Sequence, residues 1–189
     1  GQLMVVIGLI KEGRLPSQKI AYLGHGRVTE HLAEDELVDF CSALSEVDEA
    51  GVWVALDILN MYMHGNNNYD FEQLKPLLER LLLSVSFIKT HKVGQLGGYH
   101  WLKSVEKILK KGDSEFASNL VDYLLNQVAN NEIDFSDLWD VFHPALYSAF
   151  DLYADDIWPS FSQKILNLSE SRPIYRLAEL LRSGKKARQ

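Results

Sequence analysis

Apolar residues recur at helical spacing along most of this chain, with polar residues between them. In each such segment the apolar positions lie three or four residues apart, so they fall on one face of a helix. Sustained alternation of apolar and polar residues is scarce, and no Asn-Gly or Asp-Gly turn separates two β-branched runs. The pattern predicts an all-α protein with helices over residues 34–44, 48–65, 71–88, 97–112, 114–131, 136–154, 157–168 and 171–184.

Several residues near the predicted helix ends have strong conformational preferences. Gly65 can supply the left-handed turn that ends many helices. Asp70 and Gln73 are spaced as a capping box, in which each side chain accepts a hydrogen bond from the backbone N–H of the other. Pro76 is expected to bend or divide the helix that follows Asp70, and Pro144 to kink a later one, because proline lacks the N–H donor.

The stretch DLYADDIWPSF, residues 151–161, gathers three aspartates around a tyrosine and a tryptophan. Asp151 and Asp155 are four residues apart, so they share a helix face on which a divalent cation could bind. Two carboxylates fall short of the six or more oxygens that calcium takes. Asp155 or Asp156 fits better as the N-cap of a helix that carries Pro159 in its first turn, so the stretch is interpreted as a helix junction.

Grouped in pairs, the predicted helices begin near residues 34, 70, 114 and 156, at intervals of 36, 44 and 42 residues. This spacing matches two-helix repeats of the HEAT and armadillo kind. It predicts antiparallel helical hairpins that stack as a short right-handed α-α superhelix. One helical repeat domain is expected over residues 1–183, followed by a tail or linker over 184–189.

The predicted units also share a faint sequence similarity. Trp101 and Trp158 are each followed by Ile-Leu seven and eight residues later. At the level of pattern, residues 30–183 resemble the α-helical repeat regions of large multidomain bacterial proteins. The resemblance implies a scaffold or recognition arm beside a separate effector domain, and it transfers no functional residues. The Gly-Gln start and the final RSGKKARQ also suggest a piece of a longer polypeptide.

Charge is strongly segregated along the chain, although the net charge is only −7. Residues 1–72 carry 4 basic and 12 acidic side chains, and residues 73–111 carry 8 and 2. Residues 112–163 carry no basic and 10 acidic side chains, and residues 164–189 carry 7 and 2. Two interpretations remain open: neighbouring units of opposite charge pair when they stack, or an exposed acidic surface attracts a basic partner.

The charge blocks supply the candidate binding residues. A partner-binding acidic surface would be formed by Asp134, Asp137, Asp140, Asp151 and Asp155. An anion-binding basic face would be formed by Lys89, Lys92, Lys103, Lys107 and Lys110. The basic stretch also holds Tyr99 and Trp101, which would suit nucleic acid, but it lacks arginine and both aromatic residues are expected on the apolar stripe of their helix.

No catalytic, cofactor or metal motif is found in the sequence. The six histidines include no pair four residues apart, which a helical zinc site would need. Cys41 lies in line with Leu37 and Leu44, which indicates a buried thiol. The glycines of residues 23–31 lack the Gly-Lys-Ser/Thr of a phosphate-binding loop and favour a tight turn. We therefore expect no catalytic, cofactor-binding or metal-binding residues.

Together these features predict a non-catalytic helical-repeat scaffold or protein-interaction region of a larger cytoplasmic protein. The apolar run from Leu3 to Ile10 is too short to span a bilayer, so no membrane association is expected. The expected partners are other domains of the same protein or a separate protein, and nucleic acid is disfavoured. The alternatives are a nucleic-acid-binding module that uses the basic face and, third, a helical enzyme or metal protein that uses the aspartates of residues 134–156.

Overall fold

The computed structural model describes residues 2–20, 32–66, 68–85, 95–111, 114–130, 135–168 and 182. Every regular element in these residues is a helix, and no strand occurs among them, so the predicted all-α class is confirmed. The elements are α1 (Gln2–Lys11), η1 (Ser17–Ile20), α3 (Glu34–Ser45), α4 (Glu49–Gly65), α5 (Phe71–Leu82), α7 (Gln95–Lys111), α8 (Ser114–Ala129) and α9 (Phe135–Leu168).

The chain divides into two compact units, Gly1–Ser104 and Val105–Gln189, and the division falls within α7. The first unit contains α1, η1, α3, α4, α5 and the first part of α7. The second contains the rest of α7 with α8 and α9. The single domain over residues 1–183, the tail over 184–189 and the right-handed superhelix stay predictions.

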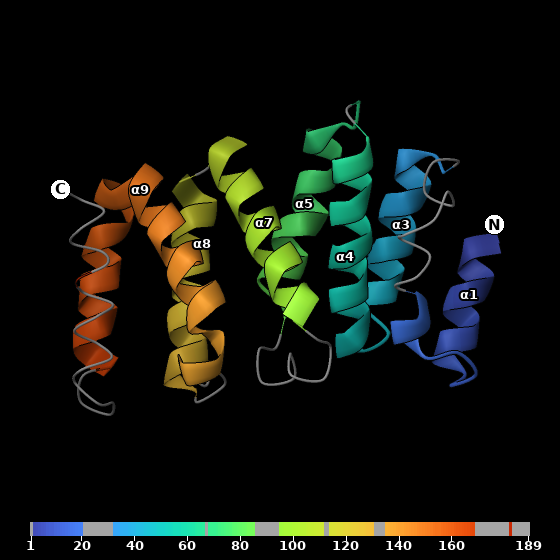
Figure 1. Cartoon of the computed structure of the whole chain (residues 1–189), viewed down its shortest axis with the longest axis horizontal. Helices are drawn as coiled ribbons and strands as arrows, with labels where there is room; N and C mark the ends of the chain where they lie inside the picture. Colours follow the sequence, from blue (N-terminus) through green and yellow to red (C-terminus); the bar gives the residue numbers. More distant parts are fainter. Residues whose placement is uncertain are drawn as a thin grey trace. The chain divides into compact units, whose positions relative to one another are not determined.

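Helix α4 forms the centre of the first unit, with α3 and α5 packed against it (Figure 1). Its sequence is apolar on most sides, and its buried side chains include Trp53, Leu56 and Leu59. Helix α3 is amphipathic and buries Leu37, Phe40, Cys41 and Leu44. The predicted burial of Cys41 is thus confirmed, and α3 and α4 form a helical hairpin.

Two small polar features hold the turn between α3 and α4. Asp48 is the N-cap of α4, and its Oδ1 accepts a hydrogen bond of 2.6 Å from the backbone N–H of Gly51. The buried Ser17 hydroxyl of η1 donates to the same carboxylate at 3.0 Å. A Cβ added at Gly51 would lie 2.2 Å from the carbonyl oxygen of Leu44, so the turn needs glycine there.

The start of α5 differs in part from the prediction. Asp70 is its N-cap and accepts from Glu72 N–H at 3.1 Å, as a capping residue should. Gln73 does not complete the capping box, because the backbone N–H of Asp70 donates to the carboxylate of Glu34 at 3.0 Å instead. The same carboxylate accepts a hydrogen bond of 2.7 Å from the Tyr62 hydroxyl. Glu34 therefore joins α3, α4 and α5.

The predicted left-handed turn at Gly65 is wrong, and Pro76 does not divide its helix. Helix α4 does end at Gly65, but this glycine lacks a positive φ and the chain leaves through Asn66 in an extended conformation. Helix α5 continues past Pro76 because Leu74, Leu77 and Leu78 hold it against the core. Pro76 is exposed, so water can satisfy the carbonyl that its missing N–H leaves unbonded. The helix ends at Leu82, earlier than predicted.

In the second unit α8 and α9 form a hairpin, and α9 itself folds back at Tyr153 (Figure 1). Tyr153 has non-helical backbone angles, with φ −135° and ψ 31°. The rings of Phe150 and Phe161 are 4.7 Å apart, whereas eleven residues of straight helix would separate their Cα atoms by about 16 Å. The predicted helix junction within residues 151–161 is confirmed.

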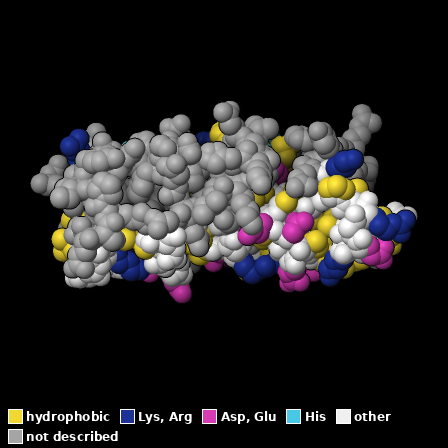
Figure 2. Space-filling model, turned by 90° about the horizontal axis from the view of Figure 1, so that it is seen from below, with side chains coloured by type: hydrophobic (Ala, Val, Ile, Leu, Met, Phe, Trp, Pro, Cys, Tyr) yellow, Lys and Arg dark blue, Asp and Glu magenta, His cyan; other side chains and the backbone are white. Residues whose placement is uncertain are grey.

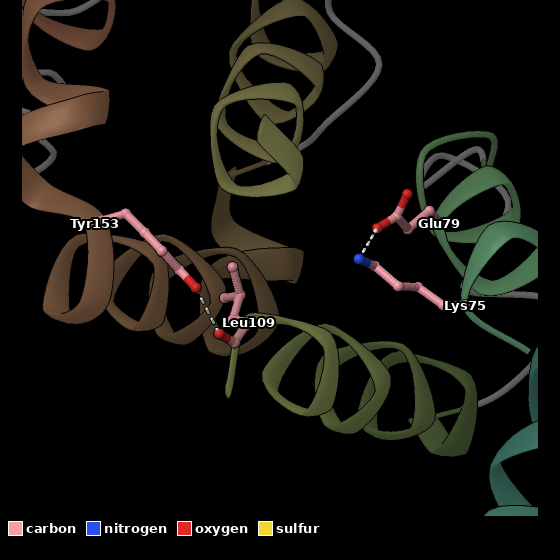
Figure 3. Close-up of polar contacts among 4 residues, drawn as sticks. All are labelled: Lys75, Glu79, Leu109 and Tyr153. Atoms are coloured by element: carbon pink, nitrogen blue, oxygen red, sulfur yellow. Dashed lines mark hydrogen bonds and ion pairs between the residues drawn. The ribbon is translucent and has the colours of Figure 1, made fainter. Parts of the chain in front are cut away.

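The position of the bend corrects two details of the prediction. Pro144 lies within helical backbone and does not break α9, because Ala145, Leu146 and Ala149 are fully buried around it. The break comes two residues before Asp155, so Pro159 lies beyond the first turn of the second arm. The Tyr153 hydroxyl donates to the carbonyl oxygen of Leu109 at 3.0 Å, which fixes the bend against the end of α7 (Figure 3).

Helix α1 was not among the predicted helices. It is formed by the early apolar run and packs against α3 through Ile7 and Ile10. Gly13 follows it with a φ of 72°, which provides the left-handed turn that ends the helix. None of the helices in the described parts of the chain has the length and apolar character that a membrane crossing requires.

Candidate interaction surface

The structure places the predicted acidic residues in three different situations. Asp151 and Asp155 are exposed on α9, one on each side of the bend at Tyr153. Asp137 and Asp140 lie on the first arm of α9, but their side chains are outside the described part. Asp134 lies outside the described residues. The described part of the acidic surface is therefore the region of the bend.

Exposed apolar side chains accompany these acids. Tyr147 is 38% exposed and Leu152 is 49% exposed, whereas Leu146 and Phe150 of the same arm are fully buried. Tyr147 precedes Asp151 by four residues, so the two side chains are neighbours on one helix face. Asp156, directly after the bend, is also exposed. We use the name bend surface for the exposed residues on both sides of the bend, which are Tyr147, Asp151, Leu152, Asp155 and Asp156.

The sequence around the bend surface is strongly acidic, because residues 112–163 contain no lysine or arginine. Lys164 follows that block, and its ammonium group forms an ion pair with Asp122 of α8. Lys110 and Lys111 at the end of α7 are exposed close to the Leu109 carbonyl that Tyr153 contacts. Asp155 takes part in a further interaction within the chain. Asp151 and Asp156 are thus the acids on which a partner site would depend.

The structure describes only some residues of the predicted basic face. Lys103 and Lys110 are exposed on α7 and Lys107 is half-buried, on successive turns of the helix. Lys89 and Lys92 lie outside the described residues. The ammonium group of Lys103 lies 5.5 Å from the centre of the Tyr99 ring, a distance at which cation and ring attract.

The expectation that both aromatic residues of this stretch face the core is half wrong. Trp101 is fully buried, and its Nε1–H donates to the carbonyl oxygen of Leu82 at 3.0 Å. Tyr99 is 55% exposed and lies on the lysine face instead. It precedes Trp101 by two residues, and residues two apart point to different sides of a helix.

The described residues give little support to acid-base, nucleophilic or metal chemistry. Burial raises the pKa of the Cys41 thiol, which keeps it protonated and unreactive at neutral pH. His100 is engaged with Asn60 of α4. Among the side chains that the structure describes, no three of the His, Cys, Asp or Glu type are grouped closely enough to hold a metal ion.

One pocket of about 350 Å³ lies in the second unit, between α8 and the second arm of α9. It is lined by Leu125, Asn126, Ala129, Lys164, Asn167 and Leu168. Its charged group, Lys164, is already paired with Asp122, and the amide of Asn167 accepts from Gln163 at 3.4 Å. The pocket thus has no pair of groups arranged for acid-base work.

The chain was compared with known proteins in three ways. No family model matches it, and neither a curated protein nor a solved structure does. The resemblance to HEAT and armadillo repeats therefore stays a prediction.

Proposed function

We propose that this chain is a non-catalytic protein-interaction region of a cytoplasmic protein, and that its bend surface binds a basic partner. The observation that carries the proposal is the exposure of Tyr147 four residues before the exposed Asp151, with Leu152 also exposed at the bend. Three other large apolar side chains near the bend, Phe150, Ile157 and Phe161, are buried. The bend surface thus combines apolar anchors with carboxylates.

This combination suits a protein partner better than a small ligand. The centres of protein interfaces are enriched in aromatic side chains, and charged residues form their rims. The acidic block would draw a partner with lysine or arginine, and the apolar contacts would hold it. An amphipathic helix with a basic edge has both properties, whether it comes from another domain of the same protein or from a separate one. The carboxylates of the bend surface would repel nucleic acid and anionic lipid.

A designed peptide tests the proposal. The peptide is an amphipathic helix of leucine and lysine, and its affinity for the full 189-residue chain is measured by calorimetry at about 50 mM and 300 mM salt. We expect Asp151→Lys to weaken binding about tenfold at low salt, because an attraction becomes a repulsion. Leu152→Ala should weaken it at both salt concentrations, because an apolar contact is not screened.

Matched controls separate a specific site from general charge attraction. Asp39 of α3 is exposed, so Asp39→Lys changes the net charge by the same amount. Leu166, on the second arm of α9, is 59% exposed and gives the control Leu166→Ala. Both controls should leave binding within about twofold of the parent chain. Equal losses for Asp39→Lys and Asp151→Lys would refute a binding site at the bend.

A second candidate function is favoured by the exposed ring of Tyr99 beside Lys103. A tyrosine of this kind can stack on a nucleotide base while lysines contact phosphates. Binding of a single-stranded oligonucleotide would then fall steeply with salt and would be reduced further by Tyr99→Ala. If Tyr99→Ala binds as well as the parent chain, the stacking role is excluded.

A further inference from the structure

Helix α1 exposes an apolar face that the described helices leave uncovered. Met4 is 51% exposed and Val5 is 64% exposed, while Ile7 and Ile10 on the other side are buried. Residues 2–10 contain no charged side chain. Figure 1 shows α1 at the edge of the first unit, beside α3. In Figure 2 the described part of this unit, on the right, shows hydrophobic side chains among both cationic and anionic ones.

This face has a projection and a notch next to each other. Val5 projects into solvent, and Gly8 lies three residues later on a neighbouring part of the helix surface. A Cβ added at Gly8 would meet no atom within 4 Å, so the space above the glycine is open. A side chain from another helix can therefore approach the backbone closely at Gly8.

We propose that this face binds the same face of a second copy of the chain, with the two α1 helices antiparallel. In that arrangement Val5 of each copy fits against Gly8 of the other, and Met4 lies opposite Leu9. Such a patch is self-complementary about a twofold axis, as the common type of symmetric dimer requires. A parallel arrangement would place Val5 against Val5 and leave both notches empty.

Charge also favours the antiparallel pair. The N-terminal end of a helix carries partial positive charge and the C-terminal end partial negative charge, so antiparallel helices attract at both ends. The uncharged segment of residues 2–10 meets an equally uncharged segment, and the exposed Lys11 and Glu12 at the end of the helix would lie at the edge of the contact, where they can keep their water.

The contact is small, and this sets the strength expected of it. One pair of ten-residue helices buries less than the roughly 1,200 Å² of a stable interface, so the dimer should be weak. We expect it to form at concentrations on the order of 0.1 to 1 mM. Because it is apolar, it should persist when salt is raised from about 0.1 to 1 M, whereas association through charge blocks would weaken.

Sedimentation equilibrium of the full chain over this concentration range tests the dimer. Val5→Arg and Gly8→Leu should each weaken association at least tenfold, the first by adding charge and the second by filling the notch. Gly8→Leu also favours helix formation, so its effect is not explained by unfolding. Leu166→Arg, at an equally exposed leucine in the second unit, should dimerise like the parent chain. A parent chain that stays monomeric, or an unchanged Gly8→Leu, overturns the proposal.

Cross-linking tests the antiparallel register. The native thiol, Cys41, is fully buried and does not interfere. Met4→Cys and Leu9→Cys chains are mixed and treated with a short thiol-specific cross-linker. We expect the mixture to cross-link several-fold faster than either variant alone, because residue 4 of one copy lies opposite residue 9 of the other. Faster cross-linking of Met4→Cys alone would show a parallel pair and overturn the register.

Discussion

At the scale of single residues, Gly51 shows how one backbone position fixes the turn between α3 and α4. A Cβ at this position would lie 2.2 Å from the Leu44 carbonyl oxygen, which is far closer than such atoms approach in proteins. Asp48 and Ser17 hold the same turn with hydrogen bonds. A methyl group on residue 51 can be accepted only if the two helices move apart.

We therefore expect Gly51→Ala to destabilise the protein by about 2 kcal/mol or more, as overpacking in a close contact does. Gly65→Ala is the matched control in the same helix, because a Cβ there meets no atom within 4 Å. It should be neutral or stabilise the fold by up to about 1 kcal/mol, because alanine favours helix more than glycine does. Urea unfolding followed by circular dichroism measures both. Equal stability of the two variants would contradict the packing argument.

Tyr62 gives a pH-dependent prediction. Its burial and its contact with the Glu34 carboxylate raise the pKa of the phenol above its ordinary value of about 10. The folded chain then holds this proton more strongly than the unfolded chain. The resulting stability is complete below about pH 10 and is lost as the pH rises through the folded pKa.

Tyr62→Phe should therefore flatten the decline of stability with alkaline pH, although it also removes the hydrogen bond at every pH. The free energy of unfolding is measured in urea between about pH 8 and 11. The difference in the free energy of unfolding between the parent chain and Tyr62→Phe should become smaller as the pH rises over that interval. A constant difference would show that ionisation of Tyr62 does not affect folding.

At the scale of elements, the helices could be predicted from sequence because their apolar residues have a clear period. Leu37, Cys41 and Leu44 were expected on one stripe of α3 and are buried there. Helix ends were less predictable. The N–H of Asp70 bonds Glu34, which is 36 residues away, and no local capping pattern contains that information.

The same limit applies to the prolines and to the candidate site. Pro76 was expected to bend or divide its helix and Pro144 to kink another, but both helices continue through their prolines, which have buried leucines and alanines around them. The acidic block and the junction after Asp151 were visible in the sequence. The exposure of Tyr147 and Leu152 could not be predicted from the sequence, because it depends on which side of α9 packs against α8.

The bend in α9 depends in part on one long-range hydrogen bond. Tyr153→Phe removes the donor to the Leu109 carbonyl oxygen while it keeps the ring. We expect a loss of about 1 kcal/mol, the usual value for such a bond. Tyr147→Phe is the control on the same arm, and it should cost less than about 0.5 kcal/mol because the side chain is partly exposed. If urea unfolding shows that Tyr153→Phe and Tyr147→Phe lose equal free energy of unfolding, the Tyr153 hydrogen bond does not stabilise the bend.

At the scale of the whole molecule, each unit has a core of its own. Trp53, Leu56 and Leu59 are buried in the first unit, and Leu124, Phe150 and Phe161 in the second. A core that is complete within its unit should respond to its own substitutions. The division within α7 thus predicts that local opening stays within one unit, whereas one continuous domain would open as a whole.

Amide hydrogen exchange distinguishes these two descriptions of the chain. Gly51→Ala should speed exchange in α3, α4 and α5 and leave α8 and α9 as they are in the parent chain. Phe161→Ala removes a ring that packs on Phe150 and should cost about 3 to 5 kcal/mol, with faster exchange confined to α8 and α9. Each variant is the control for the other. If either one speeds exchange throughout both units by the same factor, the cores are coupled, and the single helical domain expected from the repeat spacing is the better description.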